Sequence, residues 1–258
     1  MKFKTIEFSF KDKIATIKLN RPEKRNSLNP EMISELTKVF QLLNKNKNIK
    51  LVVIEGNGKT FCAGMDLLSL KKIRTNSFKE NLQDAKKLIN LLSEIYQSPK
   101  LVIAKIKGEA FAGGAGLASV CDIIFAENDS RFCYTEVKIG FVPAIVSFFL
   151  NKKIVKSYAK DLLLTGRIIS ANEAKSIGFV NYISSDSEID NEVFNYTVKI
   201  SSGVSDYSIT ETKKILNTIS KSEKIDLSKL ARINAKARKS KDCKKGIDTF
   251  LKKEKIIW

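Results

Sequence analysis

Apolar and polar residues alternate along the first part of the chain with the two-residue period of β-strands. The alternation predicts strands at Phe3–Phe10 and Ile14–Leu19, joined by the polar turn KDK. Three later runs are almost wholly apolar, as expected of strands in a sheet that is covered on both faces. These runs lie at 50–56, 101–106 and 122–126.

Between the strands, apolar residues recur every three or four positions, which is the period of helices. The stretch Glu31–Asn44 carries such a stripe, and Asn29 followed by Pro30 is a typical helix start. A longer helix is predicted at Phe78–Tyr96. Only helical patterns follow residue 201, at 207–220, 225–239 and 244–253. Strands that alternate with helices, without a Pro/Gly/Ser-rich linker, predict one α/β unit.

The size and composition are those of an ordinary globular protein. The chain has 258 residues, 43% of them hydrophobic, and this length suffices for a full core. The longest apolar stretch, Ile139–Leu150, is too short to span a bilayer and contains Pro143. The N-terminal residues lack the apolar core of a secretory signal, so we expect a cytoplasmic protein without membrane contact. The four cysteines form no CxxC pair and are expected to be free thiols.

The charge and the absence of histidine restrict the ligands and the catalytic groups that the chain can use. The net charge of +18 favours anionic partners, either phosphorylated ligands or nucleic acid, without choosing between them. The chain has no histidine, which excludes Ser–His–Asp and Cys–His nucleophile systems and most transition-metal sites. No metal is therefore expected, and proton transfer must depend on carboxylates, Lys, Tyr or water.

Four glycines follow the apolar run at 101–106, at Gly108, Gly113, Gly114 and Gly116. Their spacing does not match the G-x-G-x-x-G of dinucleotide loops, and the Gly-Lys-Ser/Thr of a phosphate loop is missing. The remaining ligand-binding interpretation is a helix that begins near Gly113 and turns its unpaired first amides toward an anionic oxygen. Close packing of a helix on the sheet would also require glycines, and this segment alone does not decide between the two.

A second segment, Phe61–Leu67 (FCAGMDL), has the same plan of a strand, a small-residue turn and a helix. Its turn is formed by Ala63 and Gly64. Two such turns could each present one backbone N–H to the same point in space. That arrangement is the minimum for an oxyanion hole made without side chains.

Both segments belong to a series of motifs that occurs in order along the chain: NRPEKRNSL, FCAGMDL, GEAFAGGAGLASVCDI, YTEVKIGFVPA, LLLTGRIISANEAKSIGFV and GIDTFLKKEKIIW. In this series the sequence resembles the enoyl-CoA hydratase/isomerase (crotonase) family. The resemblance implies a crotonase-like spiral of β-β-α units at 1–200. It also implies a C-terminal helical region at 201–258 that closes the acyl-CoA site and assembles a homotrimer or a dimer of trimers. The implied substrate is an acyl-CoA thioester, with no cofactor apart from its own coenzyme A.

The resemblance implies roles for individual residues as well. The amides of Ala63 and Gly113 are expected to bind the thioester oxygen, and Glu136 is expected to transfer protons. The implied substrate-binding residues are Lys24, Arg25, Ala63, Gly64, Met65, Asp66, Gly113, Gly114, Phe250 and Lys253. The last two match positions that in family members reach the coenzyme A of a neighbouring subunit. The basic residues in this set can also be ordinary surface side chains.

The chain departs from the hydratase pattern at one position. Family hydratases carry two glutamates that hold a water between them. Here Gly116 stands at the first position, and Glu136 is retained at the second. One carboxylate can move a proton between two carbons or accept the proton of a β-hydroxyl, provided that desolvation by an apolar neighbour such as Ile139–Leu150 raises its pKa toward neutrality. A solvated carboxylate at a helix cap is the alternative for Glu136.

Several activities fit a single glutamate. The motifs GG-x-GL and TEVKIGFVPA resemble those of methylglutaconyl-CoA hydratases, which favours hydration or dehydration of a short or branched enoyl-CoA, as in fatty acid metabolism. The alternatives are a Δ3,Δ2-enoyl-CoA isomerase, a decarboxylase of the polyketide β-branching type, and a scaffold without activity. RNA binding is a further alternative, because NKNKNIK and KARKSKDCKK are rich in lysine, although no aromatic residues interleave them.

Overall fold

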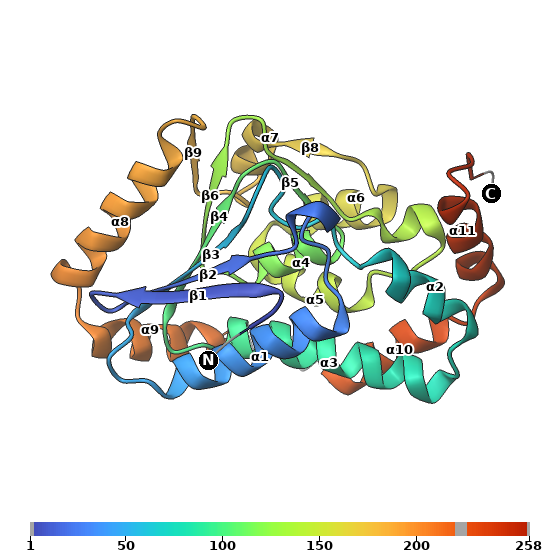
Figure 1. The fold of residues 1–258 in the computed structure, drawn as a ribbon, viewed down its shortest axis with the longest axis horizontal. Helices are drawn as coiled ribbons and strands as arrows, with labels where there is room; N and C mark the ends of the chain where they lie inside the picture. Colours follow the sequence, from blue (N-terminus) through green and yellow to red (C-terminus); the bar gives the residue numbers. More distant parts are fainter. Residues whose placement is uncertain (1–2, 220–225, 257–258) are drawn as a thin grey trace.

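A six-stranded sheet forms the centre of the molecule (Figure 1). The computed structural model describes residues 3–219 and 226–256. The strands run in the order β1-β2-β3-β4-β6-β9, in which β1 and β2 are antiparallel and all other neighbours are parallel. Their bounds are Ile6–Lys11 (β1), Ile14–Leu19 (β2), Leu51–Gly56 (β3), Leu101–Ile106 (β4), Ile123–Glu127 (β6) and Tyr182–Ser184 (β9).

Helices cover both faces of this sheet, and strand β3 shows how. On one face Ile54 lies in an apolar core with residues of α1 (Pro30–Lys45) and α3 (Phe78–Tyr96). On the other face Val53 packs against α8 (Ile189–Gly203). Because both faces are covered, nearly every position of β3 is buried, as its almost wholly apolar sequence predicts.

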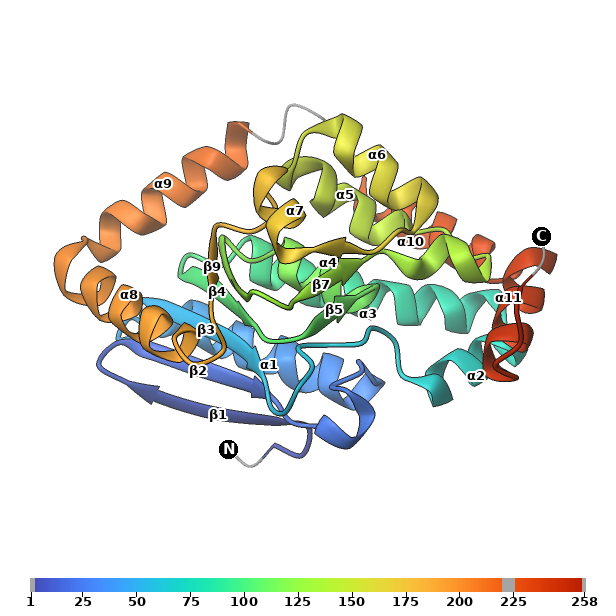
Figure 2. The same cartoon turned by 90° about the horizontal axis from the view of Figure 1, so that it is seen from above.

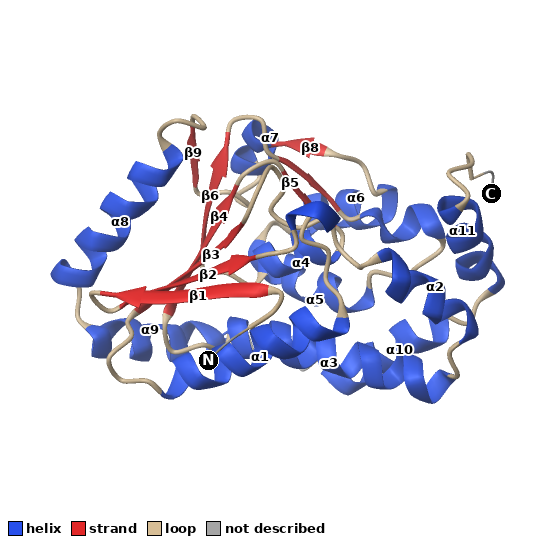
Figure 3. Ribbon diagram, viewed as in Figure 1, coloured by secondary structure: helices blue, strands red, loops and turns tan. Residues whose placement is uncertain are grey.

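The remaining helices surround the sheet and extend the molecule beyond one end of it. Figure 3 shows that the end of the molecule with α2, α3, α10 and α11 consists of helices without strands. The bounds of the remaining helices are Leu67–Thr75 (α2), Gly113–Ser119 (α4), Ala144–Lys153 (α5), Lys156–Thr165 (α6), Ala171–Ser176 (α7), Asp206–Ile219 (α9), Leu227–Ala237 (α10) and Lys241–Leu251 (α11).

A second, smaller sheet consists of β5 (Glu109–Phe111), β7 (Arg131–Cys133) and β8 (Ile169–Ser170). Strands β5 and β7 are parallel, and β7 and β8 are antiparallel. Figure 2 shows β5 and β7 side by side, with helix α4 next to them. This small sheet positions the residues that the sequence marks as functional.

The predicted elements agree with the structure in kind. The strand Ile14–Leu19 and the helix Phe78–Tyr96 have the predicted bounds, because clear turn and cap residues flank both. The first strand begins later than predicted, at Ile6, and the last helix begins earlier, at Lys241. The side chain of Ser240 caps that helix and so fixes its start.

Helix α8 runs through residue 200, where the sequence predicts the boundary between the core and the C-terminal region. A division after Gly203 keeps every helix whole. Within 3–219 and 226–256, no helix combines the length and the apolar character needed to cross a bilayer. In the same two ranges, no cluster of three or more acidic or cysteine side chains is arranged to hold a metal ion.

Candidate active site

Three parallel segments end at the same edge of the smaller sheet. Cys62 forms a parallel bridge with Ala110 of β5, and β5 pairs in parallel with β7. Because the three segments run in the same direction, the residues that follow them share one edge. Those residues are the turn at Gly64, the start of α4 at Gly113, and Glu136. The structure therefore brings both predicted turns and the retained glutamate to one edge of the sheet.

The two turns lie in direct contact. Gly64 has a φ of +92°, which strains any residue with a side chain, and a Cβ atom built on it would lie 2.9 Å from the Phe111 carbonyl oxygen. The same Cβ would lie 3.4 Å from the Gly113 nitrogen. The glycine at position 64 is therefore required both by the turn and by the backbone that faces it.

The structure corrects the prediction for Ala63. Its N–H donates to the carbonyl oxygen of Arg25 at an N···O distance of 3.0 Å, so it is not available for a substrate oxygen. The next residue, Gly64, has a positive φ. The N–H groups after it therefore no longer alternate in direction as they do along a strand. In the part of the chain that the structure describes, the N–H groups of Met65 and Gly113 have no acceptor, and both residues are partly exposed. The two available amides are thus those of Met65 and Gly113.

The residue before Gly113 has a strained backbone. Ala112 has φ of +47° and ψ of −118°, outside the left-handed helical region that other residues occasionally enter. Its N–H donates to the carbonyl oxygen of Cys133 at 2.7 Å, which fixes the turn to β7. Since this turn ends β5 and begins α4, it sets the direction of the Gly113 amide.

Ala112→Gly is expected to raise the free energy of unfolding by about 1 kcal/mol. A strained φ/ψ pair costs about 1–3 kcal/mol, and glycine relieves it while giving the unfolded chain more freedom. Chemical denaturation of both proteins measures the difference. Ala110→Gly, in the regular part of β5, is the control and should destabilise the protein. Equal destabilisation by the two substitutions would show that Ala112 carries no strain.

Glu136 has the environment of a proton-transferring carboxyl group. It lies in a short 3-10 helix, Thr135–Ile139, and its carbonyl oxygen accepts the amide of Phe141 at 2.9 Å. The residue is partly exposed, but its Oε2 atom is buried and has no hydrogen-bond partner among the residues described. Burial raises the pKa of Glu136 to about 7, because the charged form loses hydration. The carboxyl can therefore accept and release a proton near neutral pH.

Helix α4 leaves no room for a side chain at Gly116. A Cβ atom there would lie 2.5 Å from Cγ1 of Val146 on α5. Two buried hydroxyls near this part of the helix bind its backbone. Ser119 donates to the carbonyl oxygen of Gly116 (2.7 Å), and Tyr134 donates to that of Ala115 (3.4 Å). Neither supplies the carboxylate that is missing at this position.

Gly116→Ala and Val146→Ala are expected to destabilise the protein singly and to compensate each other in combination. A methyl at position 116 forces Val146 to move, and truncation of Val146 leaves a void, each at a cost of about 1–3 kcal/mol. In the double variant the new methyl group occupies part of that void. A double-mutant cycle from denaturation curves should give a coupling of about 1 kcal/mol or more. Strict additivity would contradict the contact.

Two predicted substrate-binding residues have structural roles. The Asp66 carboxylate caps α2 by accepting the Leu68 amide (2.9 Å), and it pairs with Arg21 (3.0 Å). Burial alone would raise the pKa of Asp66, but these contacts outweigh burial and the pKa is lowered. A Cβ atom on Gly114 would collide with the Cys62 carbonyl oxygen, so close packing explains this glycine.

The residues expected to contact coenzyme A lie on the surface. Lys24 and Lys253 are exposed, and the ring of Phe250, near the end of α11, is also exposed. Arg25 is exposed as well, but its guanidinium pairs with Glu109. A role for these four residues in binding coenzyme A stays a prediction.

Asn26, which lies in the motif NRPEKRNSL but is not among the predicted site residues, holds the loop of Arg25 in place. Its buried side-chain nitrogen donates to the carbonyl oxygens of Asn57 (2.9 Å) and Thr60 (2.7 Å), and its side-chain oxygen accepts the Arg21 amide. Its φ is +52°. The sequence contained a signal for this residue. Asparagine adopts a positive φ more readily than most residues, and Asn26 follows a run of charged residues.

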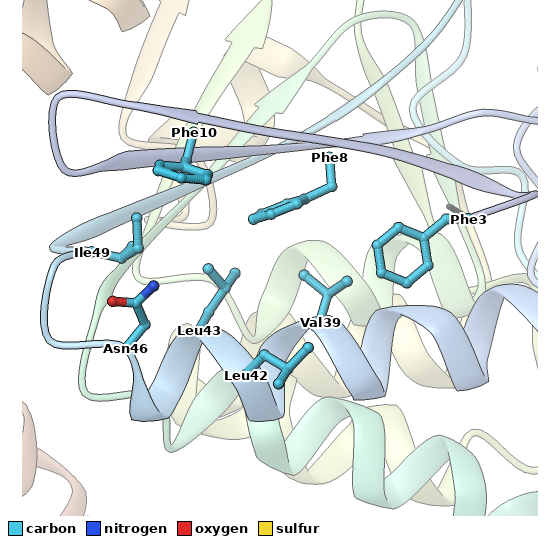
Figure 4. A pocket seen from close by; sticks show the side chains of 8 residues that line it. All are labelled: Phe3, Phe8, Phe10, Val39, Leu42, Leu43, Asn46 and Ile49. Atoms are coloured by element: carbon cyan, nitrogen blue, oxygen red, sulfur yellow. The ribbon is translucent and has the colours of Figure 1, made fainter. Parts of the chain in front are cut away.

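A pocket of about 200 Å³ lies away from this edge, between β1 and α1 (Figure 4). Figure 4 shows the rings of Phe8 and Phe10 pointing from the strand toward the helix. The lining residues are Phe3, Phe8, Phe10, Val39, Leu42, Leu43, Asn46 and Ile49. This lining contains no acid or base that could move a proton, so the pocket is not the candidate active site.

Known proteins are similar in sequence to this chain along most of its length. The family model of enoyl-CoA hydratase/isomerase matches residues 9–258. A protein of Thermus thermophilus described as an enoyl-CoA hydratase is 38% identical over 244 residues, which are 94% of this chain and 96% of the relative. The peroxisomal Δ(3,5)-Δ(2,4)-dienoyl-CoA isomerase of Arabidopsis thaliana is 32% identical over 228 residues, which are 83% of this chain and 82% of that protein.

Solved structures share the fold. An enoyl-CoA hydratase/isomerase from Xanthobacter autotrophicus superimposes with a TM-score of 0.89 at 25% identity, covering 97% of this chain and 94% of that one. An enoyl-CoA hydratase from Mycobacterium avium gives a TM-score of 0.84 at 28% identity and covers 97% of both chains. The crotonase-like fold predicted from the sequence is thereby confirmed. The chain belongs to the enoyl-CoA hydratase/isomerase family.

Proposed function

We propose that this enzyme is an enoyl-CoA hydratase that acts, in either direction, on a short or branched enoyl-CoA of the methylglutaconyl type. The main support is the buried carboxyl oxygen of Glu136, which has no partner among the described residues and lies at the same sheet edge as two unpaired amides. The relatives described as hydratases support the same activity. Coenzyme A is part of the substrate, and the reaction needs no further cofactor.

In this reaction the amides of Met65 and Gly113 hold the thioester oxygen, and each well-placed donor lowers the barrier by about 2.7–4 kcal/mol. Glu136 accepts a proton from water while the water oxygen bonds to the β-carbon. The electron pair of the double bond moves toward the thioester oxygen and forms an enolate. The same proton then passes from Glu136 to the α-carbon, so that one water is added and the carboxylate is restored. A pKa of about 7 suits both transfers.

Isomerisation of a 3-enoyl-CoA to the 2-enoyl-CoA is the second candidate. Gly116 supports it, because Val146 fills the space beside this position and the reaction needs only one base. Glu136 removes a proton from C2, the two amides hold the dienolate, and the proton returns at C4. A dienoyl-CoA isomerase among the relatives also supports chemistry of this kind.

Purified protein assayed with crotonyl-CoA and with 3-hexenoyl-CoA distinguishes the two candidates. Hydration removes the absorbance of the conjugated enoyl thioester of crotonyl-CoA. Isomerisation leaves crotonyl-CoA unchanged and creates that absorbance from 3-hexenoyl-CoA. A third assay, with 3-methylglutaconyl-CoA, covers branched substrates. Failure to convert any of the three would contradict both candidates.

We include assembly as a homotrimer or a dimer of trimers in the proposal. Apolar side chains on outer helices support it, since Leu164 of α6 and Ile215 and Leu216 of α9 are all more than half exposed. Light scattering after size-exclusion chromatography is expected to give three or six times the mass of the chain. A monomer at micromolar concentration would contradict this part of the proposal.

A further inference from the structure

Three buried side chains at the contact of helices α3 and α10 have polar atoms without partners. Asn81 lies on α3, Asn234 lies on α10, and Arg238 follows the last turn of α10. They are 0%, 8% and 1% exposed, respectively. Within the described ranges, Nδ2 of Asn81, Oδ1 of Asn234 and Nε of Arg238 form no hydrogen bond. Buried polar atoms are normally paired, so this cluster needs an explanation.

The guanidinium of Arg238 is satisfied on one side only. Its Nη1 donates to the carboxylate of Asp84 on α3 at 2.6 Å, and the side chain of Asp84 is 31% exposed. A guanidinium has a second edge, formed by Nε and Nη2, that fits both oxygens of a carboxylate. In the part of the chain that the structure describes, the Nε atom of this edge has no partner. Asn81 lies one turn before Asp84 on the same helix and offers a further donor.

The cluster adjoins the candidate active site through Phe141. The guanidinium carbon of Arg238 lies 5.9 Å from the centre of the Phe141 ring, and the Phe141 amide binds the carbonyl oxygen of Glu136. The ring belongs to an apolar cluster formed with residues of α2 and α11, against which Met65 packs. Figure 1 shows these helices with α3 and α10 at the same end of the molecule. The apolar cluster therefore connects Met65 with Arg238.

A purely structural ion pair explains only part of the arrangement. It accounts for Nη1 of Arg238 and for a link between α3 and α10, but Nε of Arg238 and the side-chain nitrogen of Asn81 still have no partner among the described residues. Asn234 is anchored, since its side-chain nitrogen donates to the Val142 carbonyl oxygen (3.4 Å), and its unpaired atom is an acceptor. The unpaired donors of Arg238 and Asn81 outnumber the unpaired acceptor of Asn234. A site with these donors fits an acceptor group that has two oxygens.

We propose that Arg238 and Asn81 bind a carboxylate at the far end of the acyl group, so that the preferred substrates are coenzyme A monothioesters of dicarboxylic acids. The inference rests on the proposed acyl-CoA function and adds a specificity determinant to it. Neither residue lies in the motifs that carry the family resemblance. Asp84 keeps the guanidinium in place. A substrate that ends in a methyl group leaves both donors unpaired, and this is the basis of the discrimination.

Binding of two unreactive thioesters tests the inference without turnover. Glutaryl-CoA and butyryl-CoA differ by one carboxylate, and titration calorimetry gives both dissociation constants. We expect the wild type to bind glutaryl-CoA about 10- to 100-fold more tightly, and R238M to bring the two constants to a ratio of about one. Lys236→Met removes an exposed charge from the same helix and should keep the wild-type ratio.

The possible results separate this inference from the proposed function. Equal affinity of the wild type for the two thioesters, or an R238M protein that keeps the preference, overturns the inference and leaves the acyl-CoA function standing. Absence of binding for both thioesters contradicts the proposed function itself. If R238M does not fold, the same two dissociation constants are measured for Arg238→Lys and Asn81→Leu, and these variants test the inference. Each should reduce the preference at least about threefold, and an unchanged preference in both overturns the inference.

Discussion

Replacing Glu136 with glutamine is expected to lower kcat about a thousandfold on the enoyl-CoA that the enzyme converts best. Glutamine keeps the shape of the side chain but neither accepts nor releases a proton at neutral pH. The buried Oε2 has no partner among the residues described that could take over the transfer. Steady-state rates measure the loss. The affinity for butyryl-CoA should change less than about threefold, because the two amides that we propose to hold the thioester remain.

Glu127→Gln is a matched control for this substitution. Burial raises the pKa of Glu127 as well, but its carboxylate accepts the Gly108 amide at 3.1 Å and therefore supports a turn. The variant should keep kcat within about threefold of the wild type. A Glu136→Gln protein that retains more than about a tenth of the wild-type kcat would remove Glu136 from the mechanism.

Helix α3 shows what the local sequence determines. Ser77 accepts the amide of Glu80, and the Glu80 side chain accepts the amide of Ser77, so the helix begins with a capping box. Pro99 follows shortly after its last residue and prevents it from continuing. All of these signals lie within a few residues of the helix ends, which is why its bounds could be predicted.

Which amide of the Ala63–Met65 turn has no protein acceptor among the described residues could not be predicted in the same way. An Ala-Gly pair fits several backbone conformations, and the one that occurs depends on the contact of Gly64 with the distant Phe111 carbonyl. In the structure the Ala63 amide has a partner in the carbonyl oxygen of Arg25, whereas the Met65 amide has none among the described residues. Likewise, Val146 approaches Gly116 only through the packing of α5 on α4. Contacts between distant segments therefore set the details of the site.

The surface of the protein carries fewer free positive charges than the net charge of the sequence suggests. Lys50, in the stretch NKNKNIK, has a side chain that is 3% exposed and pairs with Asp206 at 2.9 Å. Arg238, in the stretch KARKSKDCKK, is buried and pairs with Asp84. Each of the two stretches that favour nucleic acid thus directs one cation into the protein. This weakens the RNA-binding alternative, since affinity for RNA depends on cations that can reach phosphates.

The buried carboxyl is also expected to destabilise the folded protein as the pH rises. Burial raises the pKa of Glu136 to about 7 in the folded state, whereas the ordinary value of 4.5 applies to the unfolded chain. Between these values the folded state binds more protons than the unfolded state, so the free energy of unfolding falls as the pH increases. Because each pKa unit corresponds to about 1.4 kcal/mol and the residue is partly exposed, we expect a loss of about 2–3 kcal/mol above pH 7.

Glu136→Gln removes this loss, since glutamine does not ionise. The variant should match the wild type in unfolding free energy at about pH 4.5 and exceed it by about 2–3 kcal/mol at about pH 8. Denaturation curves at both pH values measure the difference, and the comparison cancels the titration of the groups that the two proteins share. Equal stability at pH 8 would mean that the carboxyl ionises freely in the folded protein and lacks the raised pKa on which proton transfer depends. The substitution that is expected to lower kcat should therefore stabilise the fold, as expected where a buried carboxyl group is kept for its chemistry.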